Sequence, residues 1–198
     1  MNKQRNAFDY FYSQIESYNK PLSIIYNTDD TIIVHNVDSI PSGQNMSWYS
    51  NLISEIYIQY NIDSIIEKYS ADNISFLITT NEIGKSYASL TLTDDSSNEF
   101  AVIFDSRGDL DGIGDRAGSF TYAHEILHLF GAIDLYTFTD ERLELAENYF
   151  PEDLMLKHQL AAYYSTISNL DAYLIGWTDF LDKEEYGVFL TSNPQLES

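Results

Sequence analysis

The segment from Ser119 to Phe130 most constrains how this chain can fold, because it is apolar almost all round and yet carries three ionisable side chains. Its helical pattern stops at Gly131, a residue type that commonly ends helices. The apolar residues are Phe120, Ala123, Ile126, Leu127, Leu129 and Phe130. A helix that is apolar on every face belongs in the protein interior. His124, Glu125 and His128 are therefore expected to be buried, and buried imidazole and carboxylate groups need partners.

His124 and His128 lie four residues apart, which places both imidazoles on one face of a helix. This His-Glu-x-x-His pattern is typical of zinc sites, because two neutral imidazoles can bind one ion. Zinc lowers the pKa of a bound water towards ~7, and Glu125 stands where it can take a proton from that water. The alternative is a surface helix with two solvated histidines, which the apolar surroundings disfavour. We predict one zinc ion bound by both histidines, with Glu125 as general base and acid.

A catalytic zinc usually has three protein ligands, so the helix alone leaves the site incomplete. Gly131 permits a left-handed turn after His128, and Asp134 can then return to the metal. The alternative role of Asp134 is a turn or helix-capping carboxylate. We predict Asp134 as the third zinc ligand.

The pattern His124-Glu125-x-x-His128-x-x-Gly131-x-x-Asp134 resembles the zinc motif of the metzincin clan of metallopeptidases. It is similar to the variant with aspartate as third ligand, as in snapalysin-like peptidases; histidine is commoner there in the clan. Residues 134–136 (Asp-Leu-Tyr) and 175–177 (Ile-Gly-Trp) resemble segments of immune inhibitor A-like peptidases. Residues 153–155 (Asp-Leu-Met) resemble the methionine turn, which implies that Met155 lies beneath the histidines without binding the metal. Filling a core gap is the alternative role of Met155.

The third ligand has a second candidate class. In the gluzincins it is a glutamate on a later helix, and Glu144 and Glu147 lie on a helix expected over residues 141–149. The order of residues there differs from the gluzincin pattern, because Glu147 precedes an asparagine. Of the two remaining histidines, His35 is expected to be structural. His158 is expected at the surface, with an alternative metal ligand or an oxyanion donor as its other roles.

The group that stabilises the oxyanion is open as well. Many metzincins have a tyrosine shortly after the methionine turn, at the position that Lys157 occupies here. A tyrosine with this role must therefore come from elsewhere in the chain. The candidates are Tyr136, Tyr163 and Tyr164.

The order of elements, with strands and one helix first and helices after them, predicts an α+β or mixed α/β domain. The resemblance implies a metzincin-like domain in which a mixed, mostly parallel sheet packs on the active-site helix and the C-terminal part is helical. Strands are expected over residues 22–26, 31–35, 74–80, 87–93 and 100–104. Helices are expected over 1–20, 47–69 with a weak point at Asn61, 119–130 and 141–149, followed by a helical pattern as far as 177 or 181 and weak structure after that. We expect one domain, 1–198, in which 1–118 form the sheet and first helix and 119–198 the active-site helix and helical C-terminal subdomain. By the resemblance, residues 87–93 are the edge strand along which a peptide substrate binds.

Composition limits the partners. The formal charge of -21 disfavours nucleic acid and anionic membranes, and no apolar run is long enough for a membrane span. The absence of cysteine excludes disulfides and zinc–thiolate sites. The loop over 105–115 contains four aspartates, but it lacks the spacing of a calcium-binding EF-hand, so we expect an acidic loop at the rim of the cleft. We expect a monomer with no signal peptide, cytoplasmic as the chain stands and secreted if a leader has been removed.

These observations together predict a zinc-dependent endopeptidase that hydrolyses peptide bonds in a peptide or protein substrate. Two other functions stay open. One is a zinc-containing binding or immunity-type protein without catalysis, and the other is a zinc hydrolase of a non-protein amide.

Overall fold

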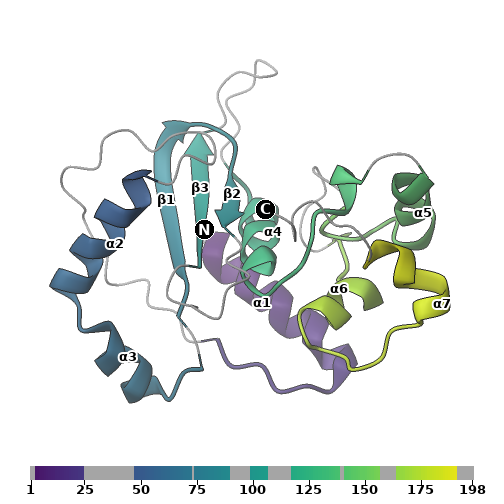
Figure 1. Ribbon diagram of the computed structural model, residues 1–198, viewed down its shortest axis with the longest axis horizontal. Helices are drawn as coiled ribbons and strands as arrows, with labels where there is room; N and C mark the ends of the chain where they lie inside the picture. Colours follow the sequence, from purple (N-terminus) through teal and green to yellow (C-terminus); the bar gives the residue numbers. More distant parts are fainter. Residues whose placement is uncertain are drawn as a thin grey trace.

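The protein is a mixed α/β structure built around a small three-stranded sheet (Figure 1). The computed structural model describes residues 3–24, 47–72, 74–89, 99–106, 117–138, 141–156 and 164–190. The expected strand at 31–35, the acidic loop beyond residue 106, and His35, Lys157, His158 and Tyr163 lie outside these ranges. Residues 21–24 form no strand, so this part of the expected strand over 22–26 is wrong.

Three strands form the sheet in the order β1-β3-β2. Strand β3 (Phe100–Ser106) is central and runs parallel to β1 (Phe76–Ile83) and antiparallel to β2 (Tyr87–Ser89). The three predicted strands from residue 74 onward are thus present, and the expected mixture of parallel and antiparallel pairing is confirmed. Strand β2 lies at an edge of the described sheet, as predicted for residues 87–93, although positions 90–93 are outside the described residues.

Helices cover both faces of the sheet. The side chains of β3 alternate between the two faces and therefore contribute to two cores. Phe100, Val102 and Phe104 pack with α2 (Ser47–Gln59) and α3 (Ile62–Tyr69). Ile103 points the other way, into the core that contains α1 (Lys3–Ile15) and α4 (Ser119–Leu129). Figure 1 shows α2 and α3 on one side of the sheet and α1 and α4 on the other.

The expected single helix over residues 47–69 is two helices. Asn61 separates them and caps the start of α3, where its side-chain oxygen accepts a hydrogen bond of 3.0 Å from the backbone N–H of Ser64. A side chain that satisfies the first amides of a helix favours a new start over continuation. The apolar spacing carried on through this weak point and therefore favoured one helix.

The N-terminal helix α1 packs against α4 rather than standing apart. Phe11 is fully buried and meets the ring of Phe130 edge-on at 6.2 Å. Lys3 forms an ion pair of 2.6 Å with Asp105 near the end of β3. The predicted helix within residues 1–20 is confirmed, and it packs on α4 as part of the same core.

The C-terminal part is helical, but less continuous than expected. Helix α5 (Glu141–Tyr149) matches its predicted bounds. In the described residues between 150 and 181, the helical pattern expected as far as 177 or 181 is mostly turns, and α6 (Asn169–Leu174) is the one α-helix there. The backbone of Asp153 instead forms a bridge with Thr166. The weak structure expected after residue 181 is also wrong for α7 (Lys183–Tyr186) and the 3-10 turn η5 (Gly187–Phe189).

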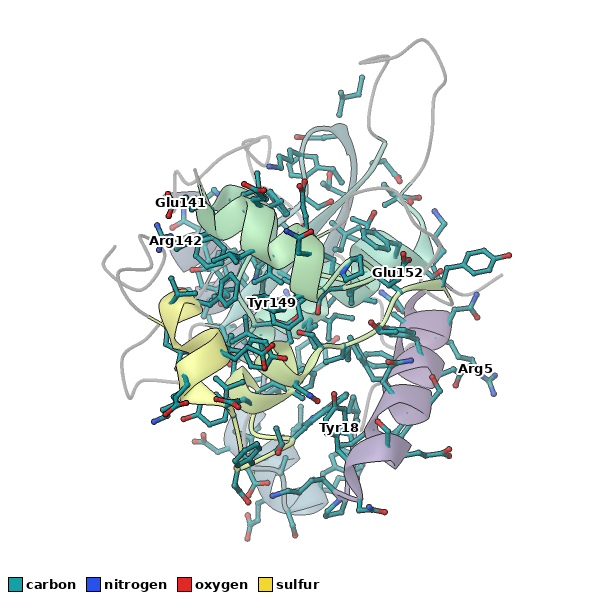
Figure 2. The ribbon with its side chains drawn as sticks, turned by 90° about the vertical axis from the view of Figure 1, so that its right-hand side faces the viewer. Arg5, Tyr18, Glu141, Arg142, Tyr149 and Glu152 are labelled. Carbon is teal, nitrogen blue, oxygen red and sulfur yellow. The ribbon has the colours of Figure 1, made fainter. Side chains whose placement is uncertain are left out.

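Aromatic packing explains why this last segment is ordered. Phe189 is fully buried and lies 5.6 Å from the ring of Phe150. Tyr186 meets Tyr149 edge-on at 5.5 Å, and Figure 2 shows Tyr149 near the end of α5 beside the C-terminal segment. Within the described residues, no helix is long and apolar enough to cross a membrane.

The sheet core provides a first test of this architecture. Phe100 is fully buried and stacks on Tyr49 at 3.7 Å, so we expect Phe100→Ala to lower the free energy of unfolding by about 3–5 kcal/mol. Ile58→Ala, at an 83 % exposed position of α2, should change it by less than about 0.5 kcal/mol. Urea denaturation followed by circular dichroism measures both, and equal effects would contradict the described packing.

Candidate metal centre

Helix α4 buries three ionisable side chains in its middle, as the sequence predicts. His124, Glu125 and His128 are 7 %, 6 % and 5 % exposed. The two imidazole rings are nearly perpendicular, with centroids 4.9 Å apart. Residues four apart on a helix stand one above the other, so the two rings face the same region beside α4.

A turn at Gly131 brings Asp134 back to these rings. Gly131 has a φ of +105°, a conformation that side-chain-bearing residues rarely adopt. The N–H of Ala132 then donates to the Leu127 carbonyl at 3.2 Å, which closes the end of the helix. Asp134 Oδ1 lies 3.0 Å from His124 Nε2 and 3.1 Å from His128 Nε2. The three predicted ligand residues are therefore brought together, with ligand atoms all within 4.8 Å of one another.

The other nitrogen of each ring faces a backbone carbonyl. His124 Nδ1 is 3.2 Å from the Leu154 oxygen, and His128 Nδ1 is 2.8 Å from the Ala132 oxygen. A carbonyl oxygen only accepts hydrogen bonds, so each Nδ1 must carry a proton. In a neutral imidazole this leaves Nε2 with a lone pair. Two lone pairs and one carboxylate oxygen then converge on the same point, an arrangement that repels itself unless a positive charge lies between them.

The spacing of these atoms suits a small cation. Ligands bound to one tetrahedral zinc at ~2.0–2.1 Å lie roughly 3.3 Å from each other. The two Nε2–Oδ1 separations of 3.0 and 3.1 Å are close to this value. The donor set of two imidazoles and one carboxylate is also typical of catalytic zinc. The residues present therefore fit a zinc ion with small adjustments of the side chains.

A proton is the competing positive charge. Burial opposes the charged forms, yet hydrogen bonds from the two histidines hold the pKa of Asp134 well below its ordinary range. Burial alone would lower the pKa of His128, but Asp134 raises it above the ordinary value. Both pKa shifts have the same cause: the negative charge of Asp134 favours a positive charge beside it.

Glu125 lies beside this group and is itself buried. Burial raises the pKa of its carboxyl group, and the charges of His124 and His128 counteract part of that rise. A carboxyl group whose pKa is raised above its ordinary value is better suited to proton transfer than an ordinary exposed one.

The turn at residues 153–155 forms hydrogen bonds with the segments that carry the candidate ligands. The Leu154 carbonyl holds His124, and the Met155 carbonyl accepts a 3.1 Å hydrogen bond from the Leu135 N–H, next to Asp134. Met155 is fully buried. The backbone of the turn thus contacts both segments that carry candidate ligands, whereas the position of the Met155 side chain beneath the histidines stays a prediction.

A buried pair of aspartates fixes that turn. Asp153 accepts hydrogen bonds from the Met155 N–H at 2.6 Å and the Ser168 N–H at 2.9 Å. Asp171 is fully buried near it, and among the described residues no donor reaches its carboxyl oxygens. Burial and the charge of Asp153 raise the pKa of Asp171 well above its ordinary value, so Asp171 keeps a proton that it can donate to Asp153.

Of the other residues that the sequence singled out, some lie near the histidines and some do not. The ring of Tyr136 is 6.0 Å from that of His124, whereas Tyr164 is 63 % exposed. Glu144 and Glu147 are exposed on α5 and do not belong to the ligand group, so Asp134 is the carboxylate that the structure places with the histidines. Trp177, in the second resembling segment, is buried against Tyr18 at 6.0 Å.

Sequence reasoning missed Lys85, Asp171 and the two carbonyls that hold the histidines. Backbone carbonyls have no sequence signal. Asp171 follows Ser168 at the spacing of a helix cap, and its N–H does donate to the Ser168 hydroxyl at 3.2 Å, which hides the burial of its carboxyl group. Lys85 comes near the site only through the pairing of β2 with β3.

Comparison with known proteins found no match: no family model, no curated protein and no solved structure resembles the chain significantly.

The turn after α4 provides a second test. Gly131→Ala forces alanine into a left-handed conformation and brings a Cβ to 3.4 Å from the Leu174 oxygen, so unfolding should become easier by about 1–3 kcal/mol. Zinc affinity should fall with it, because the turn positions Asp134. Gly187→Ala, at a glycine with φ of -60° where a Cβ would meet Lys183 at an ordinary 3.8 Å, is the matched control. Denaturation and competitive zinc titration measure both effects.

The aspartate pair predicts a pH dependence. Because the folded protein binds the Asp171 proton more tightly than the unfolded chain does, this group favours folding below its ordinary pKa of 3.8 and loses that effect as pH rises through the folded value. Asp171→Asn removes this titration and keeps a donor for Asp153. The variant should therefore gain stability relative to wild type as pH rises, by at most about 1.4 kcal/mol per pH unit.

Urea denaturation from pH 4 to 8 measures this difference. Asp63→Asn, at an exposed position of α3, is the control and should follow wild type. Parallel pH profiles for Asp171→Asn and wild type would contradict the shared proton.

Proposed function

We propose that this protein is a zinc-dependent endopeptidase of the metzincin type. The observation that carries the proposal is the convergence of His124 Nε2, His128 Nε2 and Asp134 Oδ1 on one point, with Glu125 buried beside them. Zinc bound there would supply Lewis acidity, which polarises a peptide carbonyl and makes water a stronger acid. The similarity of the motif to snapalysin-like peptidases favours the same activity.

Glu125 moves the proton in this proposal. Its carboxylate takes a proton from water as the water oxygen attacks the carbonyl carbon of the substrate. The carbon–nitrogen bond then breaks, and Glu125 gives the same proton to the leaving amine. A carboxyl group whose pKa is raised by burial can act in both directions near neutral pH.

The Leu154 and Ala132 carbonyls hold a proton on each Nδ1, which leaves each Nε2 facing Asp134 as the ring atom that would bind zinc. Tyr136 has a hydrogen bond to Asp134, and burial and the charge of Asp134 raise the pKa of its hydroxyl. Tyr136 therefore stays protonated and orients the third ligand. A second role of Tyr136 as oxyanion donor stays a prediction.

Strand β2 is the segment along which we expect the substrate to lie. It is at an edge of the described sheet, and it comes close to α4, which carries Glu125. An extended peptide pairing with such a strand gains main-chain hydrogen bonds, which need little sequence preference.

Metal analysis of the freshly purified protein tests the proposal first. We expect near-stoichiometric zinc in wild type and its loss in His128→Ala and Asp134→Asn, because both variants remove a ligand. Glu144→Gln, the matched carboxylate control on α5, should keep its zinc. Loss of zinc in Glu144→Gln and not in Asp134→Asn would contradict Asp134 as a ligand, and a wild type without zinc after zinc is added back would overturn the site.

Activity is the second measurement. Glu125→Ala should keep its zinc and lose peptide cleavage by a factor of about 10²–10⁴, the usual contribution of a general acid–base group. Undiminished cleavage by this variant would contradict the role of Glu125. If zinc-loaded wild type cleaves no peptide in a broad library, the protein is a zinc-containing binding protein, and turnover of small amides alone would make it a non-peptide amide hydrolase.

A further inference from the structure

A short turn between β1 and β2 carries a lysine to the edge of the metal centre. This turn, Gly84-Lys85-Ser86, is fixed against the buried ring of Phe104. A Cβ at Gly84 would collide with that ring, so only glycine allows the backbone to pass there. The Phe104 N–H also donates to the Ser86 hydroxyl at 3.1 Å. The backbone on both sides of Lys85 is thus tied to the central strand.

The Lys85 side chain extends from this turn towards the site. Its ammonium nitrogen lies 5.7 Å from the ring centre of Tyr136, and that ring is 6.0 Å from the ring of His124. The two distances together place the ammonium no more than about 12 Å from the His124 ring. Lys85 is exposed, whereas Glu125 and the histidines are buried, so its charge lies outside the buried centre.

Lys85 brings a positive charge to this edge of the centre, on the side where the Tyr136 ring lies. An ammonium this near to the site would attract an anionic group of a bound molecule.

We propose that Lys85 is a specificity-determining residue that binds a carboxylate of the substrate. This inference rests on the proposed peptidase function and names its substrate class, namely peptides with a carboxylate close to the scissile bond. Extended peptide advances about 3.3 Å per residue, so the reach of Lys85 covers roughly three residues on one side of that bond. The carboxylate is either an acidic side chain or the C-terminus of a short peptide.

In a protein with an overall charge of -21, a single cation near the site matters for the choice of substrate. The field of the whole protein repels an anionic peptide at long range. At ~0.15 M salt that field is screened beyond about 8 Å, whereas contact with one exposed ammonium persists in part. Lys85 should therefore decide which peptide is held correctly, and not how fast peptides arrive.

The test uses zinc-loaded full-length protein and fluorogenic peptides of one length. A single Glu, Gln or Lys is moved through the three positions on each side of the scissile bond, with amidated C-termini. A second series has no acidic residue and a free C-terminal carboxylate, which separates the two sources. The enzymes are wild type, Lys85→Met, Lys85→Glu and Lys183→Met, a control that removes an exposed lysine from α7. Zinc content and thermal stability are measured for each.

We expect wild type to prefer Glu over the isosteric Gln at one or two positions by about fivefold in kcat/KM, the size of an exposed ion pair. Lys85→Met should abolish this preference, Lys85→Glu should reverse it in favour of Lys, and Lys183→Met should keep it. Equal cleavage of Glu and Gln peptides at all positions by wild type would overturn the proposal. Equal loss on every peptide in Lys85→Met would overturn it as well, since Lys85 would then act on the reaction itself.

A binding measurement separates this inference from the proposed activity. Glu125→Ala loaded with zinc binds peptides without the proton-transfer group, and fluorescence anisotropy reports its affinity. Tighter binding of Glu than Gln peptides, lost on adding Lys85→Met, supports the Lys85 site even if wild type cleaves nothing, an outcome that would overturn the peptidase proposal alone. Cleavage without any such preference in binding or rate would overturn the Lys85 site alone.

Discussion

The meeting of two imidazole lone pairs and one carboxylate oxygen is the constraint on which the rest of this structure depends. Each Nδ1 is committed to a backbone carbonyl, so each neutral ring presents an unprotonated Nε2 to Asp134. Such a group is unfavourable in an apolar interior without a positive charge between its members. The backbone nevertheless imposes this arrangement. The helical spacing determines the positions of the two rings, and the Gly131 turn determines the position of the carboxylate.

The surrounding structure holds this arrangement from three directions. The sheet lies against one side of α4, α1 covers another, and the turn at residues 153–155 contacts both His124 and the segment after Asp134. That turn depends on Asp153, whose carboxylate accepts two backbone N–H bonds deep in the core. Placing Asp171 against it is costly, because two buried carboxyl groups must share a proton. A site that must hold ligand atoms to within a few tenths of an ångström gives a reason for a rigid polar support at this position.

The sequence predicted what local spacing determines and missed what the folded backbone brings together. His124, Glu125, His128 and Gly131 follow from the helix period and its end, and the return of Asp134 follows from the glycine turn. Asn61 was the weak point of the predicted helix over 47–69, but the apolar spacing continued across it and favoured one helix. The turn η5 was missed because Phe189 packs on Phe150, a residue far away in the sequence. Lys85 was missed because strand pairing, which no local pattern encodes, carries it towards Tyr136.

A divalent cation and a proton would balance the negative charges of the centre to different extents. With both imidazoles neutral, the ionised carboxylates of Asp134 and Glu125 place two negative charges side by side in the core. One proton on His128 balances only the first of these charges, and burial raises the pKa of Glu125 and so disfavours the second. A divalent ion balances both carboxylates, so Glu125 can ionise and accept a proton from water. In the proposed function the metal and the base are therefore coupled: a divalent ion bound by the three candidate ligands would also favour the ionised form of the neighbouring glutamate.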